Sequence, residues 1–279
     1  MRTPSGCSTA APLPTLLLVA VGLAVAPPVS AAGELPESGS ARYILLEGGE
    51  RRGHETLEWT LEADDDTYRI TRIREYRQNP SGGGYEGDRR IRRTREVSEG
   101  ALEGDLAQPE RYEVRTATVF LPSGEEDVEA AFEETESTTT LSVRFNGEAP
   151  EDGDDGGEAE GDEVAVPAGT LDPLTHRWQL MQEAPEAERY EALSHQVVNR
   201  EGKTEEVTFR VEGRQTVRTP AGTFRAVRLA RQDPSRQQAA RWYMAEDWAG
   251  LPVRTVTTRA EHHAQRTRLE RIEQAPGAD

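Results

Sequence analysis

The chain has 279 residues, of which 33 are Lys or Arg and 51 are Asp or Glu, so its formal net charge is −18. A field of this sign repels nucleic acids and anionic membranes, and we expect neither as a partner. The one cysteine, Cys7, precedes the first apolar run. Without that N-terminal segment the chain has no thiol, which excludes disulfides, thiolate metal sites and cysteine nucleophiles.

Residues 1–32 have the pattern of a secretory signal peptide. Arg2 is followed by an apolar run from Leu13 to Ala26 and then by small residues up to Ala32. The apolar run is short for a spanning helix, so we expect cleavage after Ala31 or Ala32, with an uncleaved anchor as the alternative. The sequence therefore predicts a periplasmic protein that has no membrane span after cleavage.

One β-rich domain is predicted over residues 41–274, between a flexible tail at 33–40 and a short tail at 275–279. Apolar and polar side chains alternate with the period of two that marks half-buried strands. In the first half this pattern predicts strands at 41–46, 57–62, 67–77, 89–97, 111–121 and 138–145. Residues 125–136 fit either a short acidic helix or a loop.

Residues 147–163 contain many acidic and small side chains and no large apolar one. Such a composition cannot offset the entropy of ordering, so we predict a disordered acidic loop. Its carboxylates lack the spacing of a calcium-binding loop. A solvated spacer is the simpler interpretation, with a partner-binding segment as the alternative.

One short amphipathic helix is predicted to begin after Asp172. Asp172 is a good N-cap, Pro173 suits the first helical position, and Pro185 ends the helix soon after residue 182. The apolar side chains that recur at helical spacing are Leu171, Leu174, Trp178 and Met181. Because this stripe needs an apolar partner, we expect the helix to pack against the sheet.

The remainder of the chain is predicted to form antiparallel strands. Their ranges are 194–199, 205–212, 215–219, 223–231, 240–245, 253–259 and 265–272. A hairpin tip, Thr219-Pro220-Ala221-Gly222-Thr223, is predicted to join the strands at 215–219 and 223–231. Pro220 favours the turn, and Gly222 can adopt the left-handed conformation that returns the chain to the ladder.

Four segments of the C-terminal half carry a family resemblance. They are Phe209-Arg210-Val211-Glu212-Gly213, Val217 to Phe224, Trp242 to Asp247, and Leu251-Pro252-Val253-Arg254. In order and spacing the chain resembles the bacterial exported domain-of-unknown-function 3108 family, over about residues 41–274 and most closely from Asp172 to Gln274. The resemblance implies a mainly β fold, an antiparallel curved sheet or half-open barrel with one short helix against it. It implies no activity.

No catalytic constellation is evident. The histidines His54, His176, His195, His262 and His263 lack metal-binding spacing, and no Gly-x-Ser-x-Gly motif is present. Neighbours on a strand point to opposite faces, so Ser194 and His195 do not form a dyad. We predict no catalytic residue, metal site or cofactor, and keep a hydrolase that uses carboxylates in a cleft as an alternative.

A basic ribbon is predicted across the glycine-rich loop at 79–84. The anion-binding candidates on its two strands are Arg72, Arg74, Arg90 and Arg92. Guanidinium groups bind phosphate and carboxylate through paired hydrogen bonds, so the ribbon is a candidate site for anionic head groups. The alternative is that these arginines pair with acidic side chains on neighbouring strands.

Large aromatic side chains on the predicted sheet and helix faces are the second set of candidates. They are Trp59, Tyr68, Trp178, Phe224 and Trp242. A curved sheet with one helix can enclose an apolar cavity, although such residues more often form the core. We therefore predict a non-enzymatic periplasmic protein for binding or envelope maintenance, with an apolar or lipid-like ligand. A scaffold for another envelope protein is the alternative, and the oligomeric state is left open.

Overall fold

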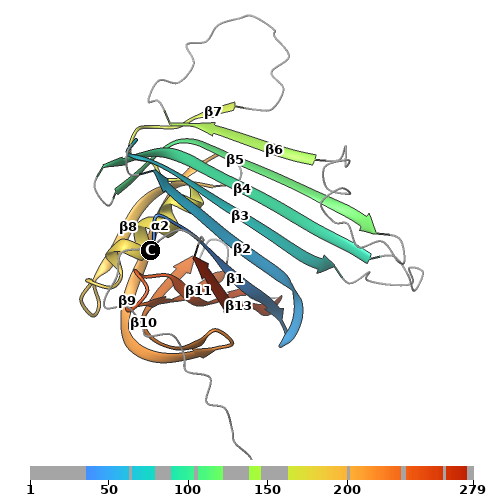
Figure 1. Ribbon diagram of the computed structural model, residues 1–279, viewed down its shortest axis with the longest axis vertical. Coiled ribbons are helices and arrows are strands. Elements are labelled where there is room, and N and C mark those ends of the chain that lie inside the picture. The colour runs from blue at the N-terminus through green and yellow to red at the C-terminus, as the bar shows by residue number, and fades with distance from the viewer. Residues whose placement is uncertain are drawn as a thin grey trace, which may run out of the picture. The chain divides into compact units, whose positions relative to one another are not determined.

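The computed structural model describes residues 36–62, 65–78, 89–103, 106–121, 138–145, 163–199, 202–233, 237–259 and 262–274 (Figure 1). The predicted signal peptide, residues 125–136, the acidic loop up to residue 162 and the tail at 275–279 lie outside these residues. Within them, no helix has the length and apolar character needed to cross a membrane.

The strands form one sheet. In chain order they are β1 (Ser38–Glu47), β2 (Glu50–Glu62), β3 (Thr67–Gln78), β4 (Arg89–Glu103), β5 (Leu106–Leu121), β6 (Thr138–Arg144), β7 (Glu163–Ala165), β8 (Ala192–Val198), β9 (Thr204–Thr219), β10 (Gly222–Asp233), β11 (Gln238–Ala245), β12 (Pro252–Arg259) and β13 (His262–Gln274). Their order across the sheet is β7-β6-β5-β4-β3-β2-β1-β13-β12-β11-β10-β9-β8. Neighbouring strands are antiparallel except for β6 and β7.

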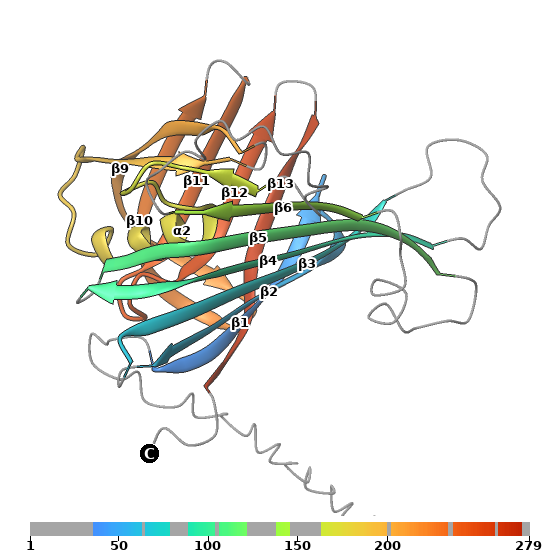
Figure 2. The same cartoon turned by 90° about the horizontal axis from the view of Figure 1, so that it is seen from above.

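The sheet curves around the helix α2 (Pro173–Glu183), as Figures 1 and 2 show. Strands β1–β7 make one wall and strands β8–β13 make the other. The first and last strands, β1 and β13, pair with each other where the two walls join. The mainly β fold predicted from the sequence, a curved antiparallel sheet with one short helix against it, is confirmed.

The two edges of the sheet are linked through the segment from Glu163 to Leu171, which we call the seam. At its start β7 pairs with β6, and at its end Leu171 forms a parallel bridge to Val197 in β8. The Leu171 N–H donates to the Gln196 carbonyl, and the Val198 N–H donates to the Leu171 carbonyl, each at 2.8 Å. The half-open barrel is therefore bridged at its opening by the chain that leads into α2.

The start of α2 follows from its sequence. The Asp172 side chain accepts hydrogen bonds from the Leu174 N–H at 2.7 Å and the Thr175 N–H at 3.1 Å, and Pro173 occupies the first helical turn. These contacts satisfy N–H groups that have no partner within the helix. The helix ends at Glu183, as the proline at position 185 predicts. The predicted helix and its N-cap are therefore confirmed.

Side chains from both walls and from α2 make one hydrophobic core. The helix contributes Leu174, Leu180 and Met181, each almost fully buried. Among the fully buried side chains, the largest apolar ones of the strands and turns are Tyr43, Tyr112, Leu229, Met244, Leu251 and Leu269. The core therefore lies between the walls and includes the buried side chains of the helix.

The predicted hairpin at the end of β9 is present. Thr219 pairs with Gly222, and Phe224 pairs with Val217 on the adjoining strands. Gly222 has φ +145°, a conformation that side-chain-bearing residues rarely adopt. The turn therefore sets the register of β9 and β10 and places Phe224 in the core.

Several element boundaries differ from the predictions, and most of the strands are longer than predicted; β2 begins at Glu50, not at 57, and β4 ends at Glu103, not at 97. The tail predicted at 33–40 is too long, because β1 begins at Ser38 and Gly39 lies against the Trp59 ring. The strands predicted at 205–212 and 215–219 are one strand, because Gly213 forms a bulge instead of a break; Arg228 pairs with Gly213, and Leu229 pairs with Val211. The short strand β7 was not predicted, since three residues carry too little periodicity.

Candidate ligand-binding cavity

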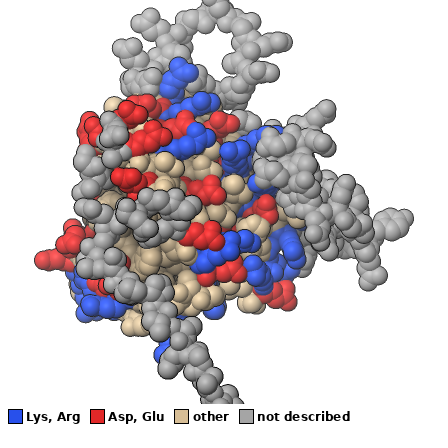
Figure 3. Space-filling view, in the orientation of Figure 1, with Lys and Arg blue, Asp and Glu red and all other residues tan. Residues whose placement is uncertain are grey.

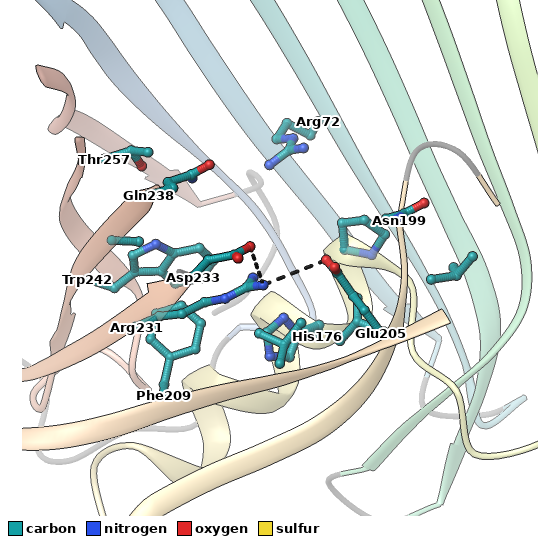
Figure 4. A pocket seen from close by; sticks show the side chains of 15 residues that line it. Arg72, His176, Asn199, Glu205, Phe209, Arg231, Asp233, Gln238, Trp242 and Thr257 are labelled. Carbon is teal, nitrogen blue, oxygen red and sulfur yellow. Dashed lines mark hydrogen bonds and ion pairs between the residues drawn. The ribbon is translucent and has the colours of Figure 1, made fainter. Parts of the chain in front are cut away.

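A cavity of about 480 Å³ lies between α2 and the wall made by β8–β12, with one contribution from β3 (Figure 4). The helix provides Pro173 and His176, and β3 provides Arg72. The opposite wall provides Val197, Val198, Asn199, Glu205, Val207, Phe209, Arg231, Asp233, Gln238, Ala240, Trp242 and Thr257. The volume lies in the range of pockets that hold small molecules.

One side of the cavity is apolar and aromatic. The rings of Phe209 and Trp242 pack at a centroid distance of 5.1 Å with an interplanar angle of 50°. Val207 and Ala240 are buried beside them in β9 and β11. Alternation along these strands points the four side chains to the concave side, where they can cover an apolar part of a ligand.

A compact ionic group lies next to this apolar side. Arg231 Nη2 is 3.5 Å from Asp233 Oδ2 and 3.7 Å from Glu205 Oε1, the two contacts drawn in Figure 4. One guanidinium thus faces two carboxylates from β9 and β10. The two carboxylates neutralise the positive charge of Arg231, so this cluster has no net positive charge to attract an anion.

The opposite side of the cavity presents Arg72 from β3. Its Nη2 donates to Oε2 of Glu96, a side chain with no exposed surface. Beyond this pair, Arg177 of α2 donates from Nη1 to Glu55 Oε1 at 2.8 Å, and both side chains are buried. Burial alone would raise the pKa of Glu55, but Arg177, Arg72 and Arg74 hold it below the ordinary value.

His176 is the helix residue that combines burial with a polar group at the cavity. Its ring lies 5.2 Å from the His195 ring and 6.0 Å from the Phe209 ring. Burial, together with the nearby His195 and Arg231, lowers the pKa of His176 to about 3. His176 is therefore neutral near pH 7, and its buried Nε2 has no hydrogen-bond partner among the described residues.

Of the five predicted cavity aromatics, Trp242 lines the cavity and the other four are buried in the core. Trp59 donates from Nε1 to the Pro36 carbonyl at 2.9 Å. The Tyr68 hydroxyl lies 3.1 Å from Ser98 Oγ and 3.0 Å from Thr175 Oγ1. The core also includes Trp178 and Phe224. These four rings therefore pack in the core between the sheet and the helix.

The four predicted anion-binding arginines share the concave face of β3 and β4. Arg72 is paired in the ladder with Glu96, and Arg74 with Thr94. Arg92 and Arg90 lie two and four residues before Thr94 in β4, so they lie on the same face, and both are exposed. Of the four, Arg72 lines the cavity, and Arg74 lies with its Nε 3.9 Å from Glu55 Oε2.

The polar cavity residues of the second wall were not singled out from the sequence. Arg231, Glu205 and Asp233 lie on strands in which charged residues alternate with apolar ones, and this pattern predicts that charged residues face solvent. The one feature of the sequence that could have identified them is their position near the ends of strands, where side chains on the concave face can reach solvent. Phe209 was noted only within the family resemblance, although it follows Val207 at the inward period of β9.

Outside the cavity, arginines and acids of the described surface are interspersed, as Figure 3 shows for one face. Examples are Arg42 Nε with Glu270 Oε2 at 3.3 Å and Arg228 Nε with Glu212 Oε2 at 2.8 Å. Exposed pairs of this kind contribute little stability each. A smaller groove of about 300 Å³ on the outer face of β3–β5 also contains both signs of charge.

In the part of the chain described by the structure, no group of three or more His, Cys, Asp or Glu side chains is arranged to hold a metal ion. The acidic loop, considered above for calcium, lies outside that part up to residue 162.

Comparisons with known proteins match part of the chain to a family whose function is unknown. Residues 128–260 match the family model described as "Protein of unknown function (DUF3108)". The family resemblance stated from the C-terminal motifs is therefore confirmed over this segment. No curated protein matches the sequence.

The fold is similar to that of a solved structure, a β-barrel-like protein of the domain-of-unknown-function 1849 family from Brucella abortus. The TM-score is 0.54 and the sequence identity 11%, over 87% of this chain and all of that one. This likeness concerns the fold alone.

Two further structures match with lower TM-scores. One, provisionally described as a lipoprotein, is from Parabacteroides distasonis (TM-score 0.28, 10% identity, 85% of this chain and 97% of that one). The other, provisionally described as exported and with a YmcC-like fold, is from Bacteroides fragilis (TM-score 0.32, 11% identity, 88% and 99%).

Proposed function

We propose that this is a non-enzymatic, exported binding protein that holds a lipid-like ligand in the cavity between α2 and the second wall of the sheet. The observation that carries the proposal is the cavity itself, about 480 Å³ in volume and lined by side chains from the helix and six strands. The signal-peptide pattern of residues 1–32 supports a periplasmic location.

The lining favours an amphipathic ligand over a purely apolar one. Phe209 and Trp242 offer an aromatic surface, and Val207 extends it. Arg72, His176 and Arg231 bring polar groups to the same space. Sites that combine an apolar wall with a few placed polar groups fix both the affinity and the orientation of a small molecule.

A dye-displacement experiment tests this proposal. The full chain is expressed, the exported protein is purified, and N-phenyl-1-naphthylamine, a neutral apolar dye, is titrated into it. We expect saturable binding that decanol displaces. Trp242→Ala should weaken dye and decanol binding by about tenfold or more, because it removes a large aromatic surface from the cavity.

The matched control is Trp248→Ala, which removes an indole that does not line the cavity. This variant should bind the dye as the wild type does, and thermal unfolding should show that both variants are folded. Absence of saturable dye and decanol binding to folded wild-type protein would refute the proposed function. Equal weakening by the two substitutions would place the site elsewhere.

A further inference from the structure

We infer that the ligand carries an anionic head group, a carboxylate or a phosphate, that binds Arg72 at the β3 side of the cavity. This inference rests on the proposed function and adds the chemistry and the orientation of the ligand. It is based on three observations: Arg72 has unused hydrogen-bond donors, buried acids hold its guanidinium in place, and the second arginine of the cavity, Arg231, faces two carboxylates.

Arg72 has donors to spare at the cavity. A guanidinium carries five N–H donors in a planar fork. Among the described residues, Arg72 makes one hydrogen bond, from Nη2 to Glu96, while its side chain is 16% exposed and lines the cavity. Figure 4 shows it entering from the wall opposite to Phe209 and Arg231. The remaining N–H groups match the oxygens of a carboxylate or phosphate.

Buried partners hold this guanidinium in place. Burial alone would lower the pKa of Arg72, but the fully buried Glu96 and the nearby Glu55 raise it above its ordinary value. Glu55 is itself bonded to Arg177 of the helix. A guanidinium fixed by such contacts loses little side-chain entropy on binding, so its hydrogen bonds to a ligand are favourable.

The second arginine of the cavity gives the ligand its direction. Arg231 faces two carboxylates, Glu205 and Asp233, which would repel a bound anion. At the other end of the cavity the two carboxylates, Glu96 and Glu55, are shared by three guanidinium groups, those of Arg72, Arg74 and Arg177, which leaves a net positive charge there. These acids lie on the same wall as Phe209 and Trp242. The anionic end therefore lies at Arg72, and the apolar part extends toward the aromatic pair.

The test compares four probes with the same ten-carbon chain in the dye-displacement experiment: decanoate, decyl phosphate, decanol and decyltrimethylammonium. Decanoate and decyl phosphate should displace the dye roughly 10- to 100-fold more tightly than decanol, the range expected for hydrogen bonds to a charged group. Decyltrimethylammonium should bind most weakly. Inorganic phosphate and acetate, which lack the chain, should not compete at the concentrations of their chain-bearing counterparts.

The key variant is Arg72→Gln combined with Glu96→Gln, which removes both charges of the buried pair and avoids leaving one carboxylate alone. It should reduce decanoate and decyl phosphate binding to the level of decanol and leave decanol binding unchanged. Arg72→Lys, which keeps the charge and loses the fork, should retain part of the preference. Arg218→Gln is the control, since Arg218 is exposed on β9 outside the cavity lining.

The outcomes separate the two proposals. Decanol binding as tight as decanoate binding, or an unchanged preference in the folded double variant, would overturn the anionic head group while the cavity proposal stands. No displacement by any of the four probes would overturn both. Inorganic phosphate competing as well as decyl phosphate would show a site for free anions and refute the lipid-like orientation.

Discussion

At the scale of single residues, Asp172 shows how one side chain serves both the helix and the sheet. Its carboxylate accepts hydrogen bonds from two backbone N–H groups of α2, from the Thr175 hydroxyl, and from the Ser98 hydroxyl of β4 at 2.6 Å. Burial raises the pKa of Asp172, although these hydrogen bonds act in the opposite direction. The N-cap therefore also attaches the start of the helix to the first wall.

His176 should make folding stability depend on pH. Its pKa is about 3 in the folded protein and 6.5 in its ordinary state, so the unfolded chain binds the proton more readily between these values. Stability from neutral His176 is present above pH 6.5 and is lost as the pH falls toward 3. Between pH 7 and pH 5 the loss is about 2 kcal/mol. Urea unfolding at both pH values measures it.

The comparison variant for this prediction is His176→Phe, which keeps a ring and removes the titration. Its unfolding free energy should fall less than that of the wild type between pH 7 and pH 5. Asp172, whose raised pKa acts with the opposite sign, is present in both proteins and cancels in the difference. Parallel stability curves for the two proteins would contradict the buried, neutral state of His176.

Gly250 and Gly169 provide a matched pair for a prediction about close packing. Both have positive φ, +70° and +80° respectively. A Cβ at Gly250 would lie 1.8 Å from the Met181 carbonyl oxygen of α2, whereas one at Gly169 would meet nothing within 4 Å. Gly169→Ala should cost about 1 kcal/mol of stability from backbone strain alone. Gly250→Ala should cost at least about 3 kcal/mol, as severe steric conflicts in a core do.

Thermal or urea unfolding of both glycine variants gives the answer. The difference between their costs isolates the contact between the turn after β11 and the backbone of α2. Similar losses at Gly250 and Gly169 would mean that the helix is not seated against this turn.

At the scale of elements, α2 is attached to the first wall by charge as well as by apolar packing. The Arg177 guanidinium lies over the Tyr43 ring at 5.1 Å and donates to Glu55 of β2. Arg177→Met should destabilise the protein by about 3–5 kcal/mol, because the Glu55 carboxylate stays buried without its closest partner. The measurement is the free energy of unfolding in urea.

A double-mutant cycle gives the control for this attachment. Adding Glu55→Gln to Arg177→Met removes the uncompensated charge and should restore most of the lost stability. If the two substitutions instead have additive costs, the pair is not coupled, and the helix is held by its apolar contacts alone.

Element by element, local signals were enough where they are strong. The cap at Asp172, the proline that follows it and the turn at Gly222 predicted their elements, because each acts through bonds to near neighbours. The bulge at Gly213 was harder, since only the partner strand decides whether a glycine interrupts a ladder. The lining of the cavity was the most difficult part to predict. Trp242 and Arg72 were predicted as candidate site residues, but Arg231 and Glu205 were not, because they meet only through the curvature of the sheet.

At the scale of the whole molecule, the two walls depend on the pair formed by β1 and β13. Nine residues of β1, from Gly39 to Glu47, have partners in β13, and β13 also pairs with β12. Removing residues 262–279 should therefore separate the walls and expose the core between them. We expect the truncated chain to lose the cooperative unfolding transition of the full chain, measured by circular dichroism and calorimetry.

The matched deletion removes only residues 275–279, which lie beyond the last strand. This shorter deletion should unfold cooperatively, close to the temperature of the full chain. A cooperative, native-like transition after removal of all of β13 would show that the walls fold as independent units.

The pairing of β1 with β13 also fixes when the fold can be completed. A ribosome makes β1 before the other described strands and β13 after them, so the middle of the sheet is the last part of it for which all residues exist. Contacts between such distant segments carry a high cost of loop closure and slow the folding of β proteins. The two walls therefore cannot be joined until β13 has been made, after the other described strands.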